Sequence, residues 1–93
     1  MEERKFVNNK DENRYELHVG KYVALVEYII NNENVVYLTH TEVPSDLGGQ
    51  GVASDLIKRT LEDIKANGYK VYPLCPFVIA YIRKNPEWAS LVR

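Results

Sequence analysis

The glycine-rich turn Gly48–Gly51 constrains the fold most, because the spacing of the apolar residues changes across it. Before the turn, apolar residues alternate with polar ones, as at Tyr15, Leu17 and Val19, which is typical of half-buried strands. After the turn, apolar residues recur at helical spacing over residues 52–64. The sequence therefore predicts a strand, a tight turn and an amphipathic helix in direct succession.

Phe6-Val7 could open a short strand, and three further segments before the turn are predicted to be strands. Residues 15–19 alternate in polarity, Tyr22–Ile30 is almost wholly apolar, and Val35–Val43 follows as a further strand. The polar cluster Asn31–Asn34 joins the last two segments and predicts an antiparallel hairpin. Pro44 ends the third strand because it offers no amide hydrogen to a sheet ladder.

The chain after the first helix predicts one more strand and a second helix. Asn67-Gly68 stops the first helix, and residues 69–74 read as a strand that is irregular at Pro73. Cys75-Pro76 then opens a helix that runs to about Lys84. The predicted fold class is α+β or α/β, with a mostly antiparallel, splayed sheet, one long helix after the glycine turn and a short C-terminal helix.

Composition limits the possible functions. The chain has 93 residues, 12 Lys and Arg and 13 Asp and Glu, so we expect a single domain over residues 1–93 and no nucleic-acid surface. The apolar runs are too short for a membrane helix, and Met1–Lys5 lacks the apolar core of a signal peptide. Cys75 is the single cysteine. We expect a cytoplasmic protein without disulfides or metal, either a monomer or a weak dimer.

The strand, glycine turn and helix together can form an anion site. The first amides of a helix have no intrahelical acceptor, and the helix dipole makes that end positive. Glycines allow a phosphate to come close to those amides. The turn matches neither the P-loop pattern nor the dinucleotide pattern Gly-x-Gly-x-x-Gly. On these residues alone, a plain glycine-rich connection remains an alternative.

A longer motif resembles a known family. Gly49–Ala53, followed by Leu56-Ile57, resembles the acetyl-CoA motif Gln/Arg-x-x-Gly-x-Gly/Ala of the Gcn5-related N-acetyltransferases (GNAT). Gly51 and Ala53 match its last two fixed positions. Gly48 stands where the family usually has Arg or Gln, so one polar side chain beside the pyrophosphate is absent here.

The chain resembles a subgroup of minimal GNAT-like proteins more closely still. Four segments carry this resemblance, in order and with the expected spacing, over residues 35–93. They are His40–Pro44, Gly49–Ala53, Pro73–Phe77 and Asn85–Trp88. Together they are much more specific than any one motif.

The resemblance implies acetyl-CoA as the cofactor and an unknown amine, on a small molecule or a protein, as the acceptor. It places the CoA pyrophosphate on the amides that open the helix, and the pantetheine arm along the preceding strand. The next strand would splay away to admit the arm. The implied cofactor-binding residues are Thr41, Glu42, Val43, Gly48, Gly49, Gln50, Gly51, Val52, Ala53 and Ser54.

Three residues are catalytic candidates. Cys75 is predicted at a helix N-terminus, which stabilises a thiolate, and the resembling subgroup carries a cysteine there that has been proposed to act in catalysis. Cys75 is either a nucleophile or a small buried apolar residue. His40 lies on the strand beside the cofactor, where it could deprotonate the thiol or the amine. Glu42 could act as general base for direct transfer, and both residues could also have no chemical role.

Two functions stay open at this point. One is acetyl transfer from acetyl-CoA to an amine, and the other is non-catalytic binding of CoA or acyl-CoA. A third, a domain that has lost cofactor binding, conflicts with the intact Gly51 and Ala53. Only strand-like sequence precedes Val35, whereas larger GNAT proteins have N-terminal helices that frame the acceptor, so we expect an open acceptor side.

Overall fold

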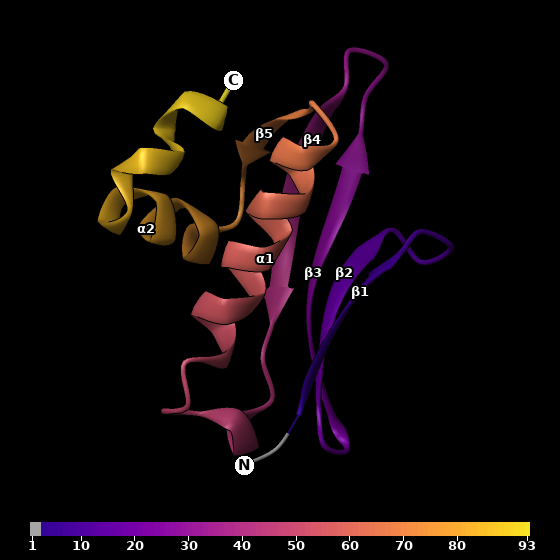
Figure 1. Ribbon diagram of the computed structural model, residues 1–93, viewed down its shortest axis with the longest axis vertical. Helices are drawn as coiled ribbons and strands as arrows, with labels where there is room; N and C mark the ends of the chain where they lie inside the picture. Colours follow the sequence, from indigo (N-terminus) through magenta and orange to yellow (C-terminus); the bar gives the residue numbers. More distant parts are fainter. Residues whose placement is uncertain (1–2) are drawn as a thin grey trace.

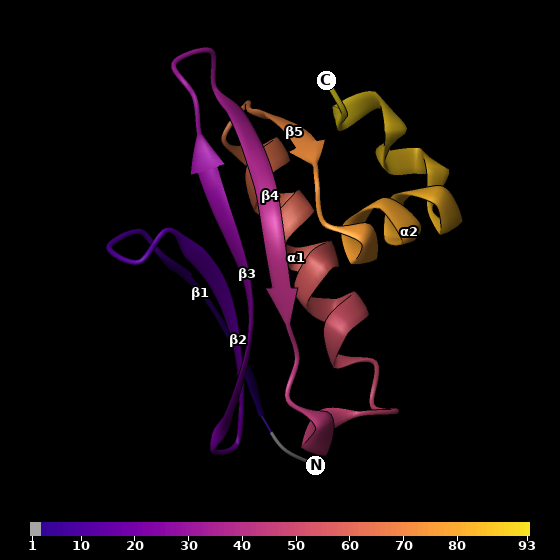
Figure 2. The same ribbon diagram turned by 180° about the vertical axis from the view of Figure 1, so that it is seen from behind.

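The computed structural model describes residues 3–93 as one sheet with its helices on one face (Figure 1). The strands lie in chain order across the sheet, and the view from behind shows a face that no helix covers (Figure 2). The strands are β1 (Arg4–Asn9), β2 (Arg14–Val19), β3 (Tyr22–Ile30), β4 (Val35–Glu42) and β5 (Lys70–Pro73). The helices are η1 (Ser45–Leu47), α1 (Val52–Ala66), α2 (Pro76–Lys84) and η2 (Pro86–Leu91).

Strands β1 to β4 pair antiparallel, and β4 pairs with β5 in parallel across the connection through α1. The predicted fold class is therefore confirmed. The predicted hairpin over residues 22–43 and both predicted helices are present, although β4 ends at Glu42. The residues after α2 differ from the simple tail we expected. They form η2, and Val92 then bridges Val71 on β5, with the Arg93 amide 2.9 Å from the Val71 carbonyl oxygen.

A bulge in β4 changes which side chains face the helices. His40 lies opposite Glu27 and Leu38 lies opposite Tyr28, so Thr39 is an extra residue on β4. Leu38 is buried against the helices, and the next residue on that face is Thr41 rather than His40. This shift in alternation positions the candidate site.

The core lies between the sheet and α1. Both surfaces contribute large apolar side chains, because successive strand residues point to opposite faces of the sheet and α1 has an apolar stripe. The largest fully buried side chains are Leu17, Leu38, Leu56, Ile57, Leu61 and Ile64. Within residues 3–93, none of the helices combines the length and the apolar composition that a bilayer crossing requires. The sequence-based argument from Met1–Lys5 rests partly on residues outside the described range.

The open face of the sheet carries one buried carboxylate, Glu16, which is only 5 % exposed. Its oxygens accept hydrogen bonds from Asn9 Nδ2 at 3.0 Å and Arg14 Nε at 2.6 Å, and lie 2.8 Å from His18 Nε2. Burial raises the pKa of Glu16, but the hydrogen bonds from Arg14, Asn9 and His18 outweigh it and lower the pKa to about 2.

We expect Glu16→Gln to lower the free energy of unfolding at pH 7 by about 1–3 kcal/mol, because it weakens a charge-assisted network. The folded pKa lies below the unfolded one, so the stabilisation is complete above the unfolded pKa, which is about 4.3. It is lost as the pH falls towards the folded value of about 2. Urea unfolding at pH 7 and pH 3 should show a smaller difference at pH 3. Glu62→Gln, on the exposed face of α1, should change stability little at either pH.

Candidate functional site

The glycine turn before α1 presents backbone N–H groups to an open surface. Gly49 and Gly51 have φ values of 75° and 71°, and a Cβ at either position would meet no atom within 4 Å. No side chain caps α1, and its first bond runs from the Asp55 amide to the Gly51 carbonyl oxygen at 3.0 Å. The amides of Val52–Ser54 therefore have no intrahelical acceptor. Such a surface attracts an anion.

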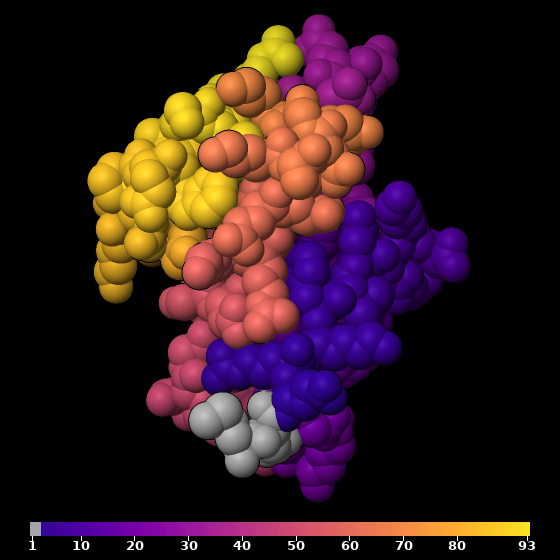
Figure 3. Space-filling model, viewed as in Figure 1, coloured from indigo at the N-terminus to yellow at the C-terminus, as the bar shows by residue number. Residues whose placement is uncertain are grey.

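Arg4 on β1 stabilises this turn through hydrogen bonds. This residue was not among those predicted from the sequence. Its guanidinium donates to the Gln50 carbonyl oxygen at 2.7 Å and to Asp55 Oδ2 at 2.9 Å. Arg59 donates to the other Asp55 oxygen at 2.8 Å. Burial raises the pKa of Asp55, but the two arginines outweigh it and hold the pKa below its usual range. Figure 3 shows the N-terminal strand, in indigo, directly against the start of α1. No local pattern marks Arg4, since 46 residues separate it from Gln50.

The glycine at position 48 belongs to the shape of this turn. A Cβ there would lie 3.1 Å from the Ser45 carbonyl oxygen of η1, a close contact. Gln50 Nε2 donates to the Asp46 carbonyl oxygen at 3.3 Å and joins the two ends of the turn. Gly48 therefore departs from the family pattern at a position where the turn packs closely against η1.

The sheet splays beyond the middle of β4. The β4–β5 ladder ends with Leu38 opposite Pro73, and the amides of Leu74 and Cys75 both donate to the Leu38 carbonyl oxygen, at 3.0 and 3.1 Å. Residues 39–42 of β4 continue with no pairing to β5. Pro73 suits the point of departure because it has no amide hydrogen.

A shallow hollow of about 460 Å³ lies at the end of β4. Thr41, Glu42 and Val43, which were predicted to meet the cofactor, line it together with Val23 and Pro44. The residues predicted to bind the cofactor therefore lie in two adjoining places. One group is at the end of β4, and the other is in the glycine turn and the beginning of α1.

Cys75 lies where α2 begins, beside the unpaired part of β4. It is 7 % exposed, and its Sγ lies 3.2 Å from Thr41 Oγ1. Burial raises the pKa of this thiol, but hydrogen bonds with the Thr41 hydroxyl and with the amides of Phe77, Val78 and Thr41 outweigh it and lower the pKa. The surroundings of the sulfur therefore stabilise the thiolate form relative to that of a free cysteine side chain.

The structure pairs Cys75 with Thr41 and places His40 elsewhere. His40 Nε2 lies 3.1 Å from Glu42 Oε1, and both side chains are exposed on the face of the sheet away from the helices. Strict alternation from Leu38 would have put His40 on the helix side, but the bulge at Thr39 puts Thr41 there instead. Of the three catalytic candidates, His40 and Glu42 therefore contact each other. Cys75 instead contacts Thr41, which was predicted only to bind the cofactor.

Comparisons with known proteins agree with this architecture. Residues 14–91 match the family model described as GCN5-related N-acetyl-transferase. The chain therefore belongs to the GCN5-related N-acetyltransferase family, and the resemblance seen in the sequence is confirmed.

A solved structure shares the fold. The NMR solution structure of a GCN5-like protein from Staphylococcus aureus superimposes with a TM-score of 0.73 and 24% sequence identity. The match covers 96% of this chain and 87% of that one. At this identity, the similarity supports the arrangement of strands and helices.

The residues present fit acetyl-CoA, the acetyl donor that this family generally uses. The open surface over Gly49 and Gly51 leaves room beside the free amides of α1. On the side of β5, residues 39–42 have no paired strand, and this edge could accept an extended, amide-containing arm. Cys75 lies beside that edge, with its Sγ 3.2 Å from Thr41 Oγ1.

Proposed function

We propose that this protein transfers an acetyl group from acetyl-CoA to an amine. The observation that carries the proposal is the splay between β4 and β5, which leaves residues 39–42 without a partner on the β5 side, next to the uncapped start of α1. A closed sheet would have covered that edge with backbone hydrogen bonds. A capped helix would have used the amides that a diphosphate needs.

Each part of the site has a separate role in binding. The amides of residues 50–54 would hold the diphosphate, with Gly48 and Gly49 shaping the approach. Residues 41–43 would pair with the pantetheine arm through their backbone. Arg4 positions the turn through Gln50 without a contact to the cofactor.

The bound cofactor supplies an acetyl group on an activated thioester. Cys75 would act as nucleophile: its thiolate bonds to the acetyl carbon, the bond from that carbon to the CoA sulfur breaks, and the CoA sulfur takes up a proton. An amine would then attack the acetyl-cysteine, lose a proton and restore the thiol. Thr41 assists because its hydroxyl donates to the thiolate as the charge forms.

Direct transfer to the amine is the alternative chemistry. Glu42, with His40 beside it, would then accept the amine proton on the open face of the sheet. His40 Nε2 and Glu42 Oε1 lie 3.1 Å apart, so each side chain would orient the other. Substitution of Cys75 distinguishes the two routes.

The first test is CoA-dependent thermal stabilisation. A ligand that binds only the folded state at 100 times its Kd stabilises by about 2.7 kcal/mol, so a clear rise in Tm should follow addition of CoA or acetyl-CoA. Adenosine diphosphate serves as the control for non-specific phosphate binding. An unchanged Tm at millimolar CoA contradicts the proposal. CoA binding without acetyl transfer to any amine in a panel of polyamines, amino acids and peptides favours a non-catalytic binding module.

Arg4→Met should weaken CoA binding by about three- to tenfold, because the Gln50 carbonyl loses a charged donor and the turn gains freedom. Titration calorimetry measures the Kd, and amide exchange at residues 50–54 should become faster. Lys5→Met removes the same charge one residue along β1, on the other face of the sheet. Equal losses in both variants would assign the effect to net charge rather than to the turn.

A further inference from the structure

Three cross-strand partners form an apolar row on the face of the sheet that no helix covers (Figure 2). Ile29 on β3 pairs with Tyr37 on β4, and Tyr37 pairs with Tyr72 on β5. Tyr28 and Val71, which precede two members of the row, are buried in the core. Because successive side chains of a strand point to opposite faces of the sheet, the row points away from the helices.

The row is exposed and already ordered. Ile29 is 63 % exposed and Tyr72 is 43 % exposed. The centroids of the two tyrosine rings lie 5.3 Å apart, and the Tyr37 hydroxyl accepts a hydrogen bond from Asn31 Nδ2 at 3.4 Å. This order reduces the side-chain freedom that would be lost when a partner binds. Adjacent exposed apolar side chains of this kind are typical of a surface that binds a partner.

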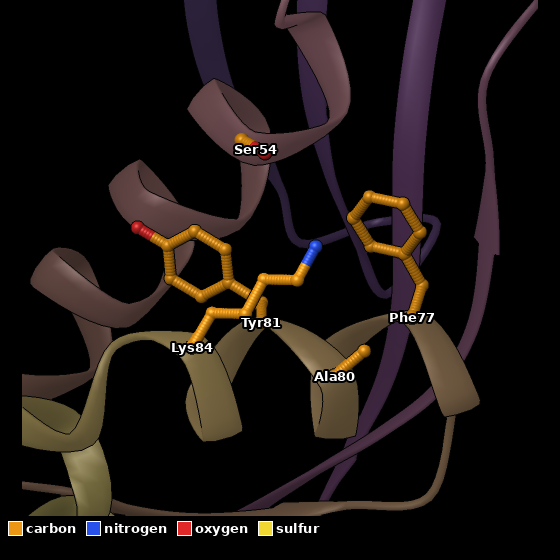
Figure 4. A pocket seen from close by; sticks show the side chains of 5 residues that line it. All are labelled: Ser54, Phe77, Ala80, Tyr81 and Lys84. Atoms are coloured by element: carbon orange, nitrogen blue, oxygen red, sulfur yellow. The ribbon is translucent and has the colours of Figure 1, made fainter.

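The other exposed large apolar side chains differ in their positions. Ile30 pairs with the buried Val36, so it lies at the end of β3 on the opposite face from the row. Leu74 follows β5 directly and precedes Cys75, so the exposed apolar surface continues to the point where β4 and β5 separate. Phe77 instead lines a small cavity between α2 and the first turn of α1, on the helix side (Figure 4).

Carboxylates lie beside the row on the same face. Glu27 is on β3 opposite His40, and Glu42 follows on β4. Among residues 3–93, Glu27 forms no ion pair, and Glu42 pairs only with His40, which is charged only when protonated. Arg14, the cross-strand partner of Glu27, is held by Glu16 at 2.6 Å. An apolar surface next to free carboxylates is complementary to a cation that has an apolar neighbour.

We infer that the acetyl acceptor is a lysine of a polypeptide, and that the row Ile29–Tyr37–Tyr72 binds an apolar side chain next to that lysine. The inference rests on the proposed function, because it names the amine that would take the acetyl group. Sites for small molecules are concave and enclose most of the ligand, whereas this row is an exposed surface that crosses three strands over about 10 Å. Such a surface contacts neighbouring residues of a chain, while the carboxylates attract the lysine.

The experiment measures acetyl transfer from acetyl-CoA to three acceptors. These are a blocked peptide with one lysine between two phenylalanines, the same peptide with serines in their places, and spermidine. We expect the wild type to have a kcat/KM about tenfold higher for the phenylalanine peptide than for the serine peptide. Tyr72→Ser and Ile29→Ser should lower the higher value about five- to tenfold through KM, because they remove apolar contact area. Both variants should keep wild-type transfer to spermidine and wild-type acetylation of Cys75.

Ile30→Ser is the matched control, since Ile30 is 42 % exposed, close to the value for Tyr72, and lies on the opposite face. This variant should retain the preference of the wild type for the phenylalanine peptide. Tyr72→Phe keeps the ring and should retain most of the preference, which excludes a folding defect as the cause of the loss in Tyr72→Ser.

Equal kcat/KM of the wild type for the two peptides overturns the inference, and so does an equal loss in Ile30→Ser or an equal loss with spermidine. A second copy of this chain is the competing occupant of the row. Sedimentation over a concentration series detects it, and a dimer that Tyr72→Ser dissociates would also overturn the inference. An unchanged Tm with CoA contradicts the proposed function, whereas CoA binding and acetyl transfer without a preference between the peptides contradict the inference alone.

Discussion

Gly51→Val is expected to reduce CoA binding by more than about 100-fold, the largest effect of any single substitution in the turn. Gly51 has a φ of 71° and precedes α1 directly, and nothing lies within 4 Å of the position that a Cβ would take. A valine side chain would occupy the open surface through which a phosphate approaches the helix amides. Titration calorimetry and CoA-dependent thermal shift both measure the loss.

The matched control for this variant is Gly68→Val. Gly68 follows α1, has a φ of 75°, and a Cβ added there would likewise meet no atom within 4 Å. Both variants should lose about 1–3 kcal/mol of stability, because a β-branched residue is strained in the left-handed region. Only Gly51→Val should lose CoA binding. Equal CoA affinity in the two variants would mean that the diphosphate does not bind at this turn.

The sequence predicted the elements of the fold well because each depends on local patterns. Polar and apolar residues alternate over residues 15–19, and the apolar stripe of α1 repeats at helical spacing. The end of the chain was predicted less well. The bridge from Val92 to Val71 joins residues that are distant in sequence, and neither residue signals the other. A segment after Pro86 can therefore look like a tail and still complete the edge of a sheet.

The candidate site was predictable in its backbone but not in its side-chain pairs. Glycine spacing locates the turn at Gly49 and Gly51, since the conformation is local. The bulge at Thr39 depends on pairing between β3 and β4, so the sequence could not show that Thr41, rather than His40, would face Cys75. Arg4 was missed for the same reason, because its contact with Gln50 exists only in the folded chain.

The paired carboxylate and histidine bear on how the acceptor reaches the site. Glu42 and His40 are exposed on the face of the sheet that no helix covers, whereas Cys75 faces the helices. An acyl group held between β4 and α2 would separate these two sides. If Cys75 carries the acetyl group, the acceptor must reach the splay itself, and the Glu42–His40 pair then contributes charge rather than proton transfer.

Incubation with acetyl-CoA should place an acetyl group on Cys75, and Cys75→Ala should lower acetyl transfer to a competent amine by on the order of 100-fold or more. The thiolate is favoured by Thr41 and by the amides around the sulfur. Intact and peptide mass spectra detect the added acetyl group.

Thr41→Val should reduce the adduct about tenfold through the lost hydrogen bond, and His40→Ala should leave it unchanged, because His40 lies on the other face of the sheet. Full transfer activity in Cys75→Ala, lost in Glu42→Gln, would instead establish direct transfer with Glu42 as the base.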